Sequence, residues 1–254
     1  MKAIESIKDS IDKFEREGAL KVENFFSKDD IDSILRSTNK FVEKEPENGK
    51  WMVYFEENLK EVGKKLVCRV ENFVDYDSTL FDVAYSDKLL KFLEKLCGEK
   101  VVLFKDKMHY KFPGGDGFKP HQDVQAKWDK YAHYFITVMV SVDESMEENG
   151  CVRIASGHHK KGLIGRYWEP LEGNELNGIE FSSTPTKPGD IIIFDSFTPH
   201  YSEPNMSSKT RRALFFTYNE ASQGDYRQIY FAEKRKNFPP DNERKPGSSY
   251  KFRV

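Results

Sequence analysis

Cysteine is scarce in this sequence, and long hydrophobic runs are absent from it. Its 254 residues include three cysteines, an odd number with no C-x-x-C pair: Cys68, Cys97 and Cys151. A disulfide-framed fold is therefore not expected, and reduced thiols favour a cytoplasmic protein. The longest strongly apolar stretch, YFITVMVSV at 134–142, is far shorter than the ~20 residues that a membrane-spanning helix needs. The opening MKAIESIKDSIDKFEREG lacks the apolar segment of a signal peptide, so we expect no membrane association.

An excess of charge of one sign is also missing. Basic residues number 40 and acidic residues 42, which leaves a net charge of -2 at pH 7. A general nucleic-acid-binding protein should show a basic excess, so we expect no nucleic-acid partner. Hydrophobic residues at 38% and aromatic residues at 14% are sufficient to form a core. The length is consistent with one domain over residues 1–254, as a monomer or a weak homodimer.

The sequence changes in character along the chain. Residues 1–100 contain helical patterns that open with the candidate N-caps Ser27 and Ser86, so this part is expected to be mostly helical. Residues 101–219 contain short β-branched and aromatic runs between turn clusters such as PGGDG and TKPGD, which indicate an antiparallel sandwich or barrel. Residues 220–254 are charged, contain proline and are expected to form a C-terminal extension. The fold class is therefore mainly β with flanking helices.

Two histidines and one aspartate form a candidate metal site. In FKPHQD, His121 and Asp123 are separated by one residue, and on a strand such residues point to the same face. His200 follows the apolar run GDIIIFD and the turn residues SFTP. Two imidazoles and a carboxylate on one side of a metal, with open positions opposite, are the facial triad of non-haem Fe(II) oxygenases. Each residue alone is more often an ordinary polar side chain, but their order within a β-rich segment favours the metal.

A candidate anchor for a dicarboxylate lies nearby. Arg211 and Arg212 open the strand-like run RRALFFTYN soon after His200. A guanidinium group binds a carboxylate through two parallel hydrogen bonds. A dicarboxylate that chelates iron at one end needs such an anchor at the other, and the hydroxyl of Ser202 is placed to add a hydrogen bond to the same group.

Taken together, these segments resemble the phytanoyl-CoA dioxygenase family of Fe(II)- and 2-oxoglutarate-dependent oxygenases. The resemblance rests on FEREGALKVENFFSKDDID, LFKDKMHYKFPGGDG, FKPHQD, ENGCVRIASGHHKKG, KPGDIIIFDSFTPHYSEPN and RRAL, and covers most of residues 14–219. It implies a double-stranded β-helix, which is a jelly-roll or cupin-like barrel. It also implies a requirement for Fe(II), 2-oxoglutarate and dioxygen, with ascorbate as a supporting reductant.

The resemblance assigns roles to individual residues. His121, Asp123 and His200 match the catalytic iron ligands of the family, and Arg211 and Ser202 match the positions that bind 2-oxoglutarate. Related halogenases have Gly or Ala in place of the metal-binding carboxylate, so the presence of Asp123 argues against chlorination.

One motif departs from the family pattern. The family often has Asn-Tyr-Lys where this sequence has the HYK of residues 109–111. We expect His109 to contact 2-oxoglutarate in place of the asparagine, and simple packing of His109 is the alternative.

The same segment suggests the charge of the substrate. Lys105, Lys107 and His109 share one face of the predicted strand. Buried lysines without partners are costly, so both are expected to meet an anionic substrate; solvation of a strand that twists outward is the alternative. Trp128, and Trp168 in a later loop-like segment, are expected near the mouth of the site, where they stack on substrate or pack a lid.

The sequence therefore predicts a 2-oxoglutarate-dependent dioxygenase that hydroxylates an unactivated C–H bond of a small anionic metabolite and releases succinate and CO2. An oxidative cyclase or desaturase of the same family in natural-product biosynthesis is one alternative. A non-catalytic metabolite-binding barrel protein is another. A zinc hydrolase with the same ligands would leave Arg211 without a role, and the sequence contains no HExxH motif.

Overall fold

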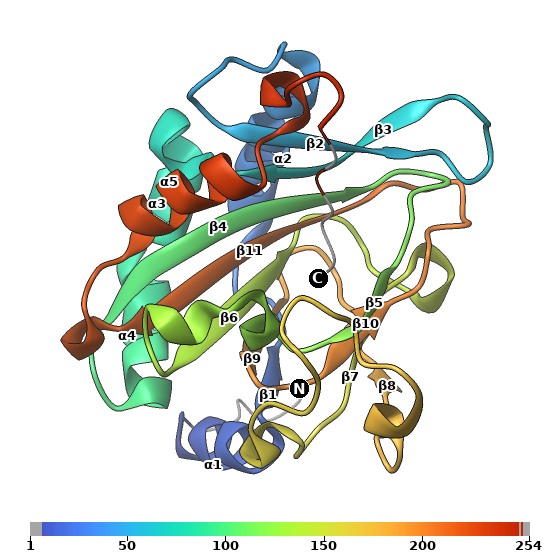
Figure 1. Ribbon diagram of the computed structural model, residues 1–254. Helices are drawn as coiled ribbons and strands as arrows, with labels where there is room; N and C mark the ends of the chain where they lie inside the picture. Colours follow the sequence, from blue (N-terminus) through green and yellow to red (C-terminus); the bar gives the residue numbers. More distant parts are fainter. Residues whose placement is uncertain (1–6, 249, 251–254) are drawn as a thin grey trace.

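The computed structural model describes residues 7–248 and residue 250 (Figure 1). The α-helices of this part of the chain are α1 Ile7–Glu17, α2 Lys28–Glu43, α3 Ser78–Ala84, α4 Asp87–Cys97 and α5 Arg227–Asn237. The β-strands are β1 Ala19–Val22, β2 Met52–Glu57, β3 Lys65–Glu71, β4 Val101–Lys111, β5 Phe118–His121, β6 Phe135–Ser141, β7 Val152–Ile154, β8 Ser182–Ser183, β9 Ile191–Asp195, β10 His200–Ser202 and β11 Arg211–Glu220. No helix among the described residues is long and apolar enough to cross a membrane.

The ends of two helices follow from their capping residues. The Ser27 hydroxyl accepts a hydrogen bond from the backbone N–H of Asp30, and the Asp30 carboxylate accepts one from the backbone N–H of Ser27, so a capping box opens α2. The Ser86 hydroxyl accepts a hydrogen bond from the backbone N–H of Leu89 and caps α4. Gly98, at φ 79°, ends α4 in the left-handed conformation that glycine adopts without steric cost. Both N-caps expected from the sequence are confirmed.

The strands form two antiparallel sheets of the jelly-roll type. The larger sheet has the order β1-β9-β6-β11-β4-β3-β2, and the smaller sheet has the order β5-β10-β7-β8. Helices α2, α3 and α4 cover the outer face of the larger sheet, and the smaller sheet faces its inner side (Figure 1). The mainly β fold with flanking helices is therefore confirmed, but the sheets do not close into one hydrogen-bonded barrel.

The larger sheet separates two apolar layers because successive side chains of a strand point to opposite faces. On β11, Leu214 packs in the outer layer with Ile34 of α2. Its neighbour Phe215 packs in the inner layer with Met139 of β6 and Val152 of the smaller sheet. Inward-pointing residues of β4 and β11 consequently reach the space between the sheets, where the site lies.

The N-terminal part contains strands as well as helices. The residues ALKV of the segment ALKVENFF form the short strand β1. The β2–β3 hairpin is not predicted from the sequence, although two β-like runs flank a turn that contains Gly63. β3 pairs with β4 so that Arg69 lies opposite His109 and Glu71 lies opposite Lys107. Directly opposite residues of paired strands point to the same face, so the hairpin adds two charged side chains to the inner face.

Candidate metal centre and substrate pocket

His121, Asp123 and His200 lie together between the sheets. β5 and β10 pair with His121 opposite His200, and the ligand atoms of all three residues lie within 4.8 Å of one another. The expectation that His121 and Asp123 share a strand is wrong, because β5 ends at His121 and Asp123 opens the 3-10 helix η2 Asp123–Ala126. The turn nevertheless keeps the pair close, with 4.0 Å between His121 Nε2 and Asp123 Oδ1.

Neighbouring groups orient each candidate ligand. His121 Nδ1 lies 2.7 Å from the carbonyl oxygen of Lys119, and His200 Nδ1 lies 3.0 Å from that of Thr198. If each Nδ1–H donates to its carbonyl, each Nε2 keeps the lone pair that binds a metal. Burial, followed by repulsion from His200, lowers the pKa of His121 to about 3, which keeps the imidazole neutral. Two neutral imidazoles and one carboxylate are a donor set that fits non-haem Fe(II).

Thr137, which sequence patterns did not single out, holds the carboxylate of the triad. Its hydroxyl on β6 donates a 3.0 Å hydrogen bond to Asp123 Oδ2. It also lies 3.0 Å from the Thr217 hydroxyl on the adjacent strand β11. Both threonines are buried, so the larger sheet fixes one oxygen of Asp123 and leaves the other directed toward the histidines.

Two buried glutamines tie the Asp123 turn to the loop that crosses the site. The Gln122 side chain donates to the carbonyls of Gly162 and Phe197 and accepts from the N–H of Ile164. It thus supports the site rather than pointing into it. The Gln125 side chain donates to the carbonyls on either side of Trp168, those of Arg166 and Glu169, and accepts from the Gln122 N–H.

Trp168 itself has a left-handed backbone at φ 64°, which is unusual for a bulky residue. Its N–H donates to the carbonyl of Gln125, and its ring packs on Phe238 at 5.4 Å. The Gln125 contacts therefore stabilise a strained backbone that places an indole ring at the cavity.

Replacing Gln125 by leucine is expected to lower the free energy of unfolding by roughly 2–4 kcal/mol, because buried backbone groups lose their partners. Urea denaturation of the metal-free protein measures the change. Gln228, exposed on α5, supplies the control Gln228→Leu, which should change stability by less than ~0.5 kcal/mol. Equal free energies of unfolding for the two variants would show that Gln125 does not stabilise the backbone around Trp168.

A second group of buried residues suits a dicarboxylate. Arg211 Nε donates to the Ser145 hydroxyl at 3.1 Å, whereas its Nη1 has no hydrogen-bond partner among the described residues. Lys111 donates to the Ser202 hydroxyl at 2.8 Å. Burial, followed by repulsion from Arg211, lowers the pKa of Lys111 to about 7. A carboxylate would bind at such a place, where two buried cations lie close to each other and one of them has an unused hydrogen-bond donor. Lys111 was not identified from the sequence.

His109 reaches the same interior. Its ring stacks on Phe118 with 4.5 Å between centroids and an interplanar angle of 4°, and it lies 4.7 Å from the Phe215 ring. Its Nε2 is buried and has no hydrogen-bond partner among the described residues. A 2-oxoglutarate oxygen or a bound water would satisfy this atom, whereas packing alone leaves it unsatisfied.

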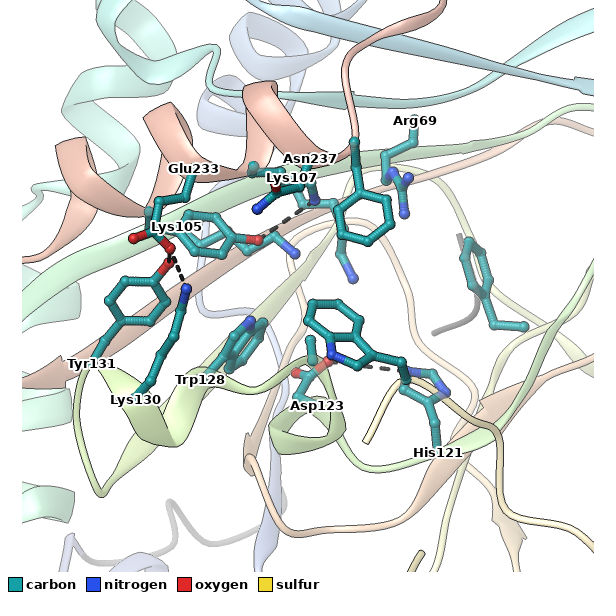
Figure 2. A pocket seen from close by; sticks show the side chains of 16 residues that line it. Arg69, Lys105, Lys107, His121, Asp123, Trp128, Lys130, Tyr131, Glu233 and Asn237 are labelled. Carbon is teal, nitrogen blue, oxygen red and sulfur yellow. Dashed lines mark hydrogen bonds and ion pairs between the residues drawn. The ribbon is translucent and has the colours of Figure 1, made fainter. Parts of the chain in front are cut away.

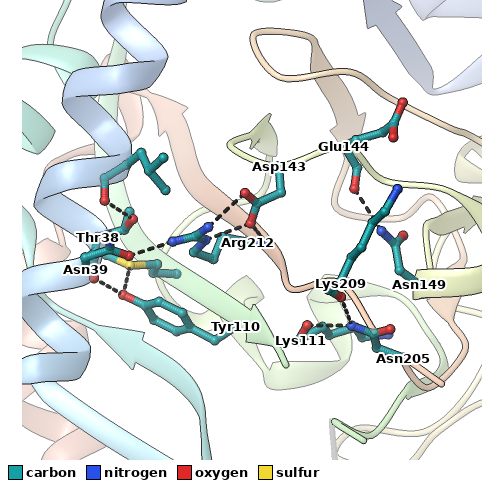
Figure 3. Close-up of polar contacts among 12 residues, drawn as sticks. Thr38, Asn39, Tyr110, Lys111, Asp143, Glu144, Asn149, Asn205, Lys209 and Arg212 are labelled. Carbon is teal, nitrogen blue, oxygen red and sulfur yellow. Dashed lines mark hydrogen bonds and ion pairs between the residues drawn. The ribbon is translucent and has the colours of Figure 1, made fainter. Parts of the chain in front are cut away.

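The second arginine of the pair points elsewhere. Arg212 binds the carboxylate of Asp143 with Nε and Nη2 at 2.7 and 2.9 Å, and its Nη1 donates to the Asn39 side chain of α2 (Figure 3). All of its nitrogens are thus used in joining β11 to α2 and to the end of β6. Alternation along β11 places Arg211 on the inner face and Arg212 on the outer face.

A cavity of ≈ 80 Å³ opens beside the metal ligands. Its lining includes Lys105, Lys107 and Trp128, for which the sequence predicts substrate contact, together with His121 and Asp123. Figure 2 shows the two lysines across the cavity from His121 and Asp123. At about 10–15 Å³ for each bound water molecule, the volume suits a substrate of only a few heavy atoms.

Buried charges missed in the sequence complete this wall of the cavity. Glu71 is fully buried, and Arg69 lies 3.0 Å from it, Lys105 lies 4.0 Å from it, and Lys234 of α5 is in direct contact with it. Burial alone would raise the pKa of Glu71, but attraction from Lys105, Lys234 and Arg69 lowers it below its ordinary value. Lys107 has no carboxylate within 4.0 Å among the described residues, and burial, followed by repulsion from Lys105, lowers its pKa to about 7.

Comparison with known proteins gives a consistent result. The sequence pattern of the phytanoyl-CoA dioxygenase (PhyH) family matches residues 14–213. The chain is 40% identical to a 2-aminoethylphosphonate dioxygenase of an uncultured bacterium, over 92% of this chain and 89% of the relative. It is 30% identical to a methylphosphonate hydroxylase of Gimesia maris, over 90% of this chain and 86% of the relative.

A solved structure has the same fold. The epimerase SnoN of nogalamycin biosynthesis, in complex with Fe3+, alpha ketoglutarate (2-oxoglutarate) and nogalamycin RO, aligns with a TM-score of 0.72 at 16% sequence identity. The alignment covers 97% of this chain and 92% of the SnoN chain. At this identity the likeness establishes the fold and not the reaction.

Proposed function

This chain belongs to the phytanoyl-CoA dioxygenase family, and we propose that it hydroxylates a C–H bond of a small phosphonate. It is a dioxygenase that uses iron and 2-oxoglutarate. In the proposed reaction one atom of dioxygen enters the substrate as a hydroxyl group. The other enters succinate, which forms together with CO2 from 2-oxoglutarate.

The charge of the cavity carries the proposal. Asp123 belongs to the metal ligand set, and Glu233 at the rim pairs with Lys130. Of the other basic side chains of the cavity, Arg69, Lys105 and Lys234 gather around the carboxylate of Glu71, and Lys107 has no carboxylate within 4.0 Å among the described residues. Several cations gathered around one buried carboxylate leave an excess of positive charge, so a bound anion should complete the site.

A phosphonate matches this excess better than a carboxylate does. Its dianion carries two charges and three acceptor oxygens, whereas a carboxylate carries one charge and two oxygens. The names of two relatives with 30% identity or more also specify phosphonate substrates. The sequence predicted an anionic substrate from Lys105 and Lys107. We propose that this anion is a phosphonate.

The residues have distinct roles in the proposed reaction. His121, Asp123 and His200 would hold the metal, and the iron, once loaded with 2-oxoglutarate and dioxygen, supplies the oxidant. Arg211 would bind the far carboxylate of 2-oxoglutarate, with Ser202 and His109 as neighbouring polar contacts. These groups would position the cosubstrate beside the candidate metal ligands.

The cavity side positions the substrate. The basic side chains would orient the phosphonate so that its adjacent C–H bond faces the metal ligands across the cavity. Trp128 is buried and Trp168 lies at the cavity wall, so the two indole rings exclude water from the space around that bond.

Substrate-dependent formation of succinate tests the proposal. Purified protein with Fe(II), ascorbate, 2-oxoglutarate and air receives methylphosphonate or 2-aminoethylphosphonate, with acetate and β-alanine as the matched carboxylates. We expect succinate and hydroxylated product in equal amounts with a phosphonate and little of either with the carboxylates. A product that has lost two hydrogens instead of gaining an oxygen identifies a desaturase or cyclase. Failure to consume 2-oxoglutarate under any condition favours the non-catalytic binding protein.

Replacing Lys107 by methionine is expected to raise the KM for the phosphonate by about ten- to one-hundredfold, because one charge-assisted contact is lost. The KM for 2-oxoglutarate should stay within about twofold of the wild-type value. Lys65, an exposed lysine at the start of β3, provides the control Lys65→Met. If both variants gave the wild-type KM for the phosphonate, Lys107 would have no part in binding it.

A further inference from the structure

Helix α5 lies outside the region that matches the family pattern. The match ends at residue 213, and α5 spans Arg227–Asn237. Figure 1 shows the helix lying along β4. Side chains of the helix line the cavity. The lining residues from this segment are Tyr230, Glu233, Lys234, Asn237 and, just after the helix, Phe238. The wall of the cavity that faces the metal ligands is therefore completed by a segment that the family pattern does not specify.

A buried ion pair attaches the start of α5 to β4. Arg227 is in direct contact with Asp106, which is fully buried and also accepts hydrogen bonds from the backbone N–H groups of Phe73 and Val74. Asp106 lies between Lys105 and Lys107 in the sequence and points to the opposite face of the strand. The strand that presents the two cavity lysines thus also determines where α5 begins.

One and two turns farther along the helix, Tyr230 and Lys234 enter the cavity wall. Lys234 is 7% exposed, and its ammonium group contacts Glu71 and lies 3.5 Å from the Tyr230 hydroxyl. Glu71 is the carboxylate that Arg69 and Lys105 also approach. Lys234 therefore belongs to the same buried charge cluster as the basic residues of the sheet, although it is far from them in sequence.

We propose that α5 is a specificity element of the substrate site, in which Lys234 is the cation that completes the anion-binding group of Arg69, Lys105 and Lys107. Glu71 acts as a positioning residue, because one carboxylate holds Arg69, Lys105 and Lys234 on the same side of the cavity. The inference rests on the proposed function for the identity of the anion, a phosphonate. It extends that function by assigning part of the recognition to residues beyond the family match.

Binding of methylphosphonate tests the assignment without turnover. Protein loaded with Fe(II) and 2-oxoglutarate is titrated anaerobically by calorimetry, and the affinity is compared among variants. We expect Lys234→Gln and Lys234→Met to weaken binding on the order of ten- to one-hundredfold. Lys234→Arg, which keeps the charge, should bind within about threefold of wild type.

The neighbouring residue Lys236 supplies the matched control. It is exposed on the same helix, so Lys236→Gln should bind methylphosphonate as wild type does. Thermal melting establishes that each variant is folded. Two neutral variants are used because glutamine can still donate a hydrogen bond to Glu71 whereas methionine cannot. If one of them does not fold, the binding affinity of the other decides the test.

The outcomes separate this inference from the proposed function. Phosphonate oxidation by wild type, with Lys234→Gln and Lys236→Gln binding equally well, would overturn the role of Lys234 and leave the proposed function intact. Binding that depends on Lys234 but leads to no oxidation would support the subsite and overturn the hydroxylase proposal. Absence of methylphosphonate binding to wild type would overturn both.

Discussion

His121→Ala and Asp123→Ala are each expected to abolish iron-dependent consumption of 2-oxoglutarate. Each substitution removes one of three donor atoms that lie within 4.8 Å of one another, and two remaining ligands leave the metal without the facial geometry of the oxygenases. Asp123→Ala also leaves the buried Thr137 hydroxyl without its carboxylate acceptor, although Thr217 remains within reach.

Two measurements check this result. Succinate formation reports turnover, and the iron content of the protein after dialysis reports metal binding. His133, an exposed histidine in the loop before β6, provides the control His133→Ala, which should keep both at the wild-type level. Undiminished iron content and turnover in Asp123→Ala would rule out the assigned metal centre.

Arg211→Ala is expected to raise the 2-oxoglutarate requirement on the order of a hundredfold, whereas Arg212→Ala leaves it nearly unchanged. Arg211 is buried on the inner face with an unused Nη1, and a bidentate charged contact to the far carboxylate accounts for a change of this size. Arg212 is on the outer face, where Asp143 and Asn39 use its nitrogens.

The comparison is made on the KM for 2-oxoglutarate at saturating iron, and stability is measured in parallel. Arg212→Ala should instead lower the unfolding temperature, because it frees the Asp143 carboxylate and breaks the link to α2. If the KM for 2-oxoglutarate rose in Arg212→Ala and not in Arg211→Ala, the anchor would have been assigned to the wrong arginine.

Several parts of the site were predictable because their signals are local in the sequence. His121 and Asp123 are one residue apart, so a strand or a tight turn brings them together. That is why the error about the end of β5 did not separate the pair. The choice of Arg211 over Arg212 came from the family resemblance, and the structure gives it a physical basis, because β11 alternates its side chains between two faces. Lys105 and Lys107 reached the cavity for the same reason.

Other parts depend on pairing between distant segments. Arg69 and Glu71 reach the cavity because β3 pairs with β4 in a particular register, and a shift by one residue would have turned both to the other face. Lys234 reaches Glu71 because Arg227 and Asp106 place α5 along the sheet. Nothing in the local sequence of the charged tail distinguishes Lys234 from its neighbour Lys236.

The sequence by itself determined the kind of protein. A β-rich chain bears H-x-D, a later histidine and an arginine in the order of an iron oxygenase, and residue type together with short-range spacing carry that information. Only the tertiary structure decided how the cavity is charged, since that depends on which residues of β3, β4 and α5 meet around Glu71. The physical reason is that metal-ligand chemistry follows from donor types placed close along the chain, whereas the electrostatic balance of a cavity is a sum over groups that only folding brings together.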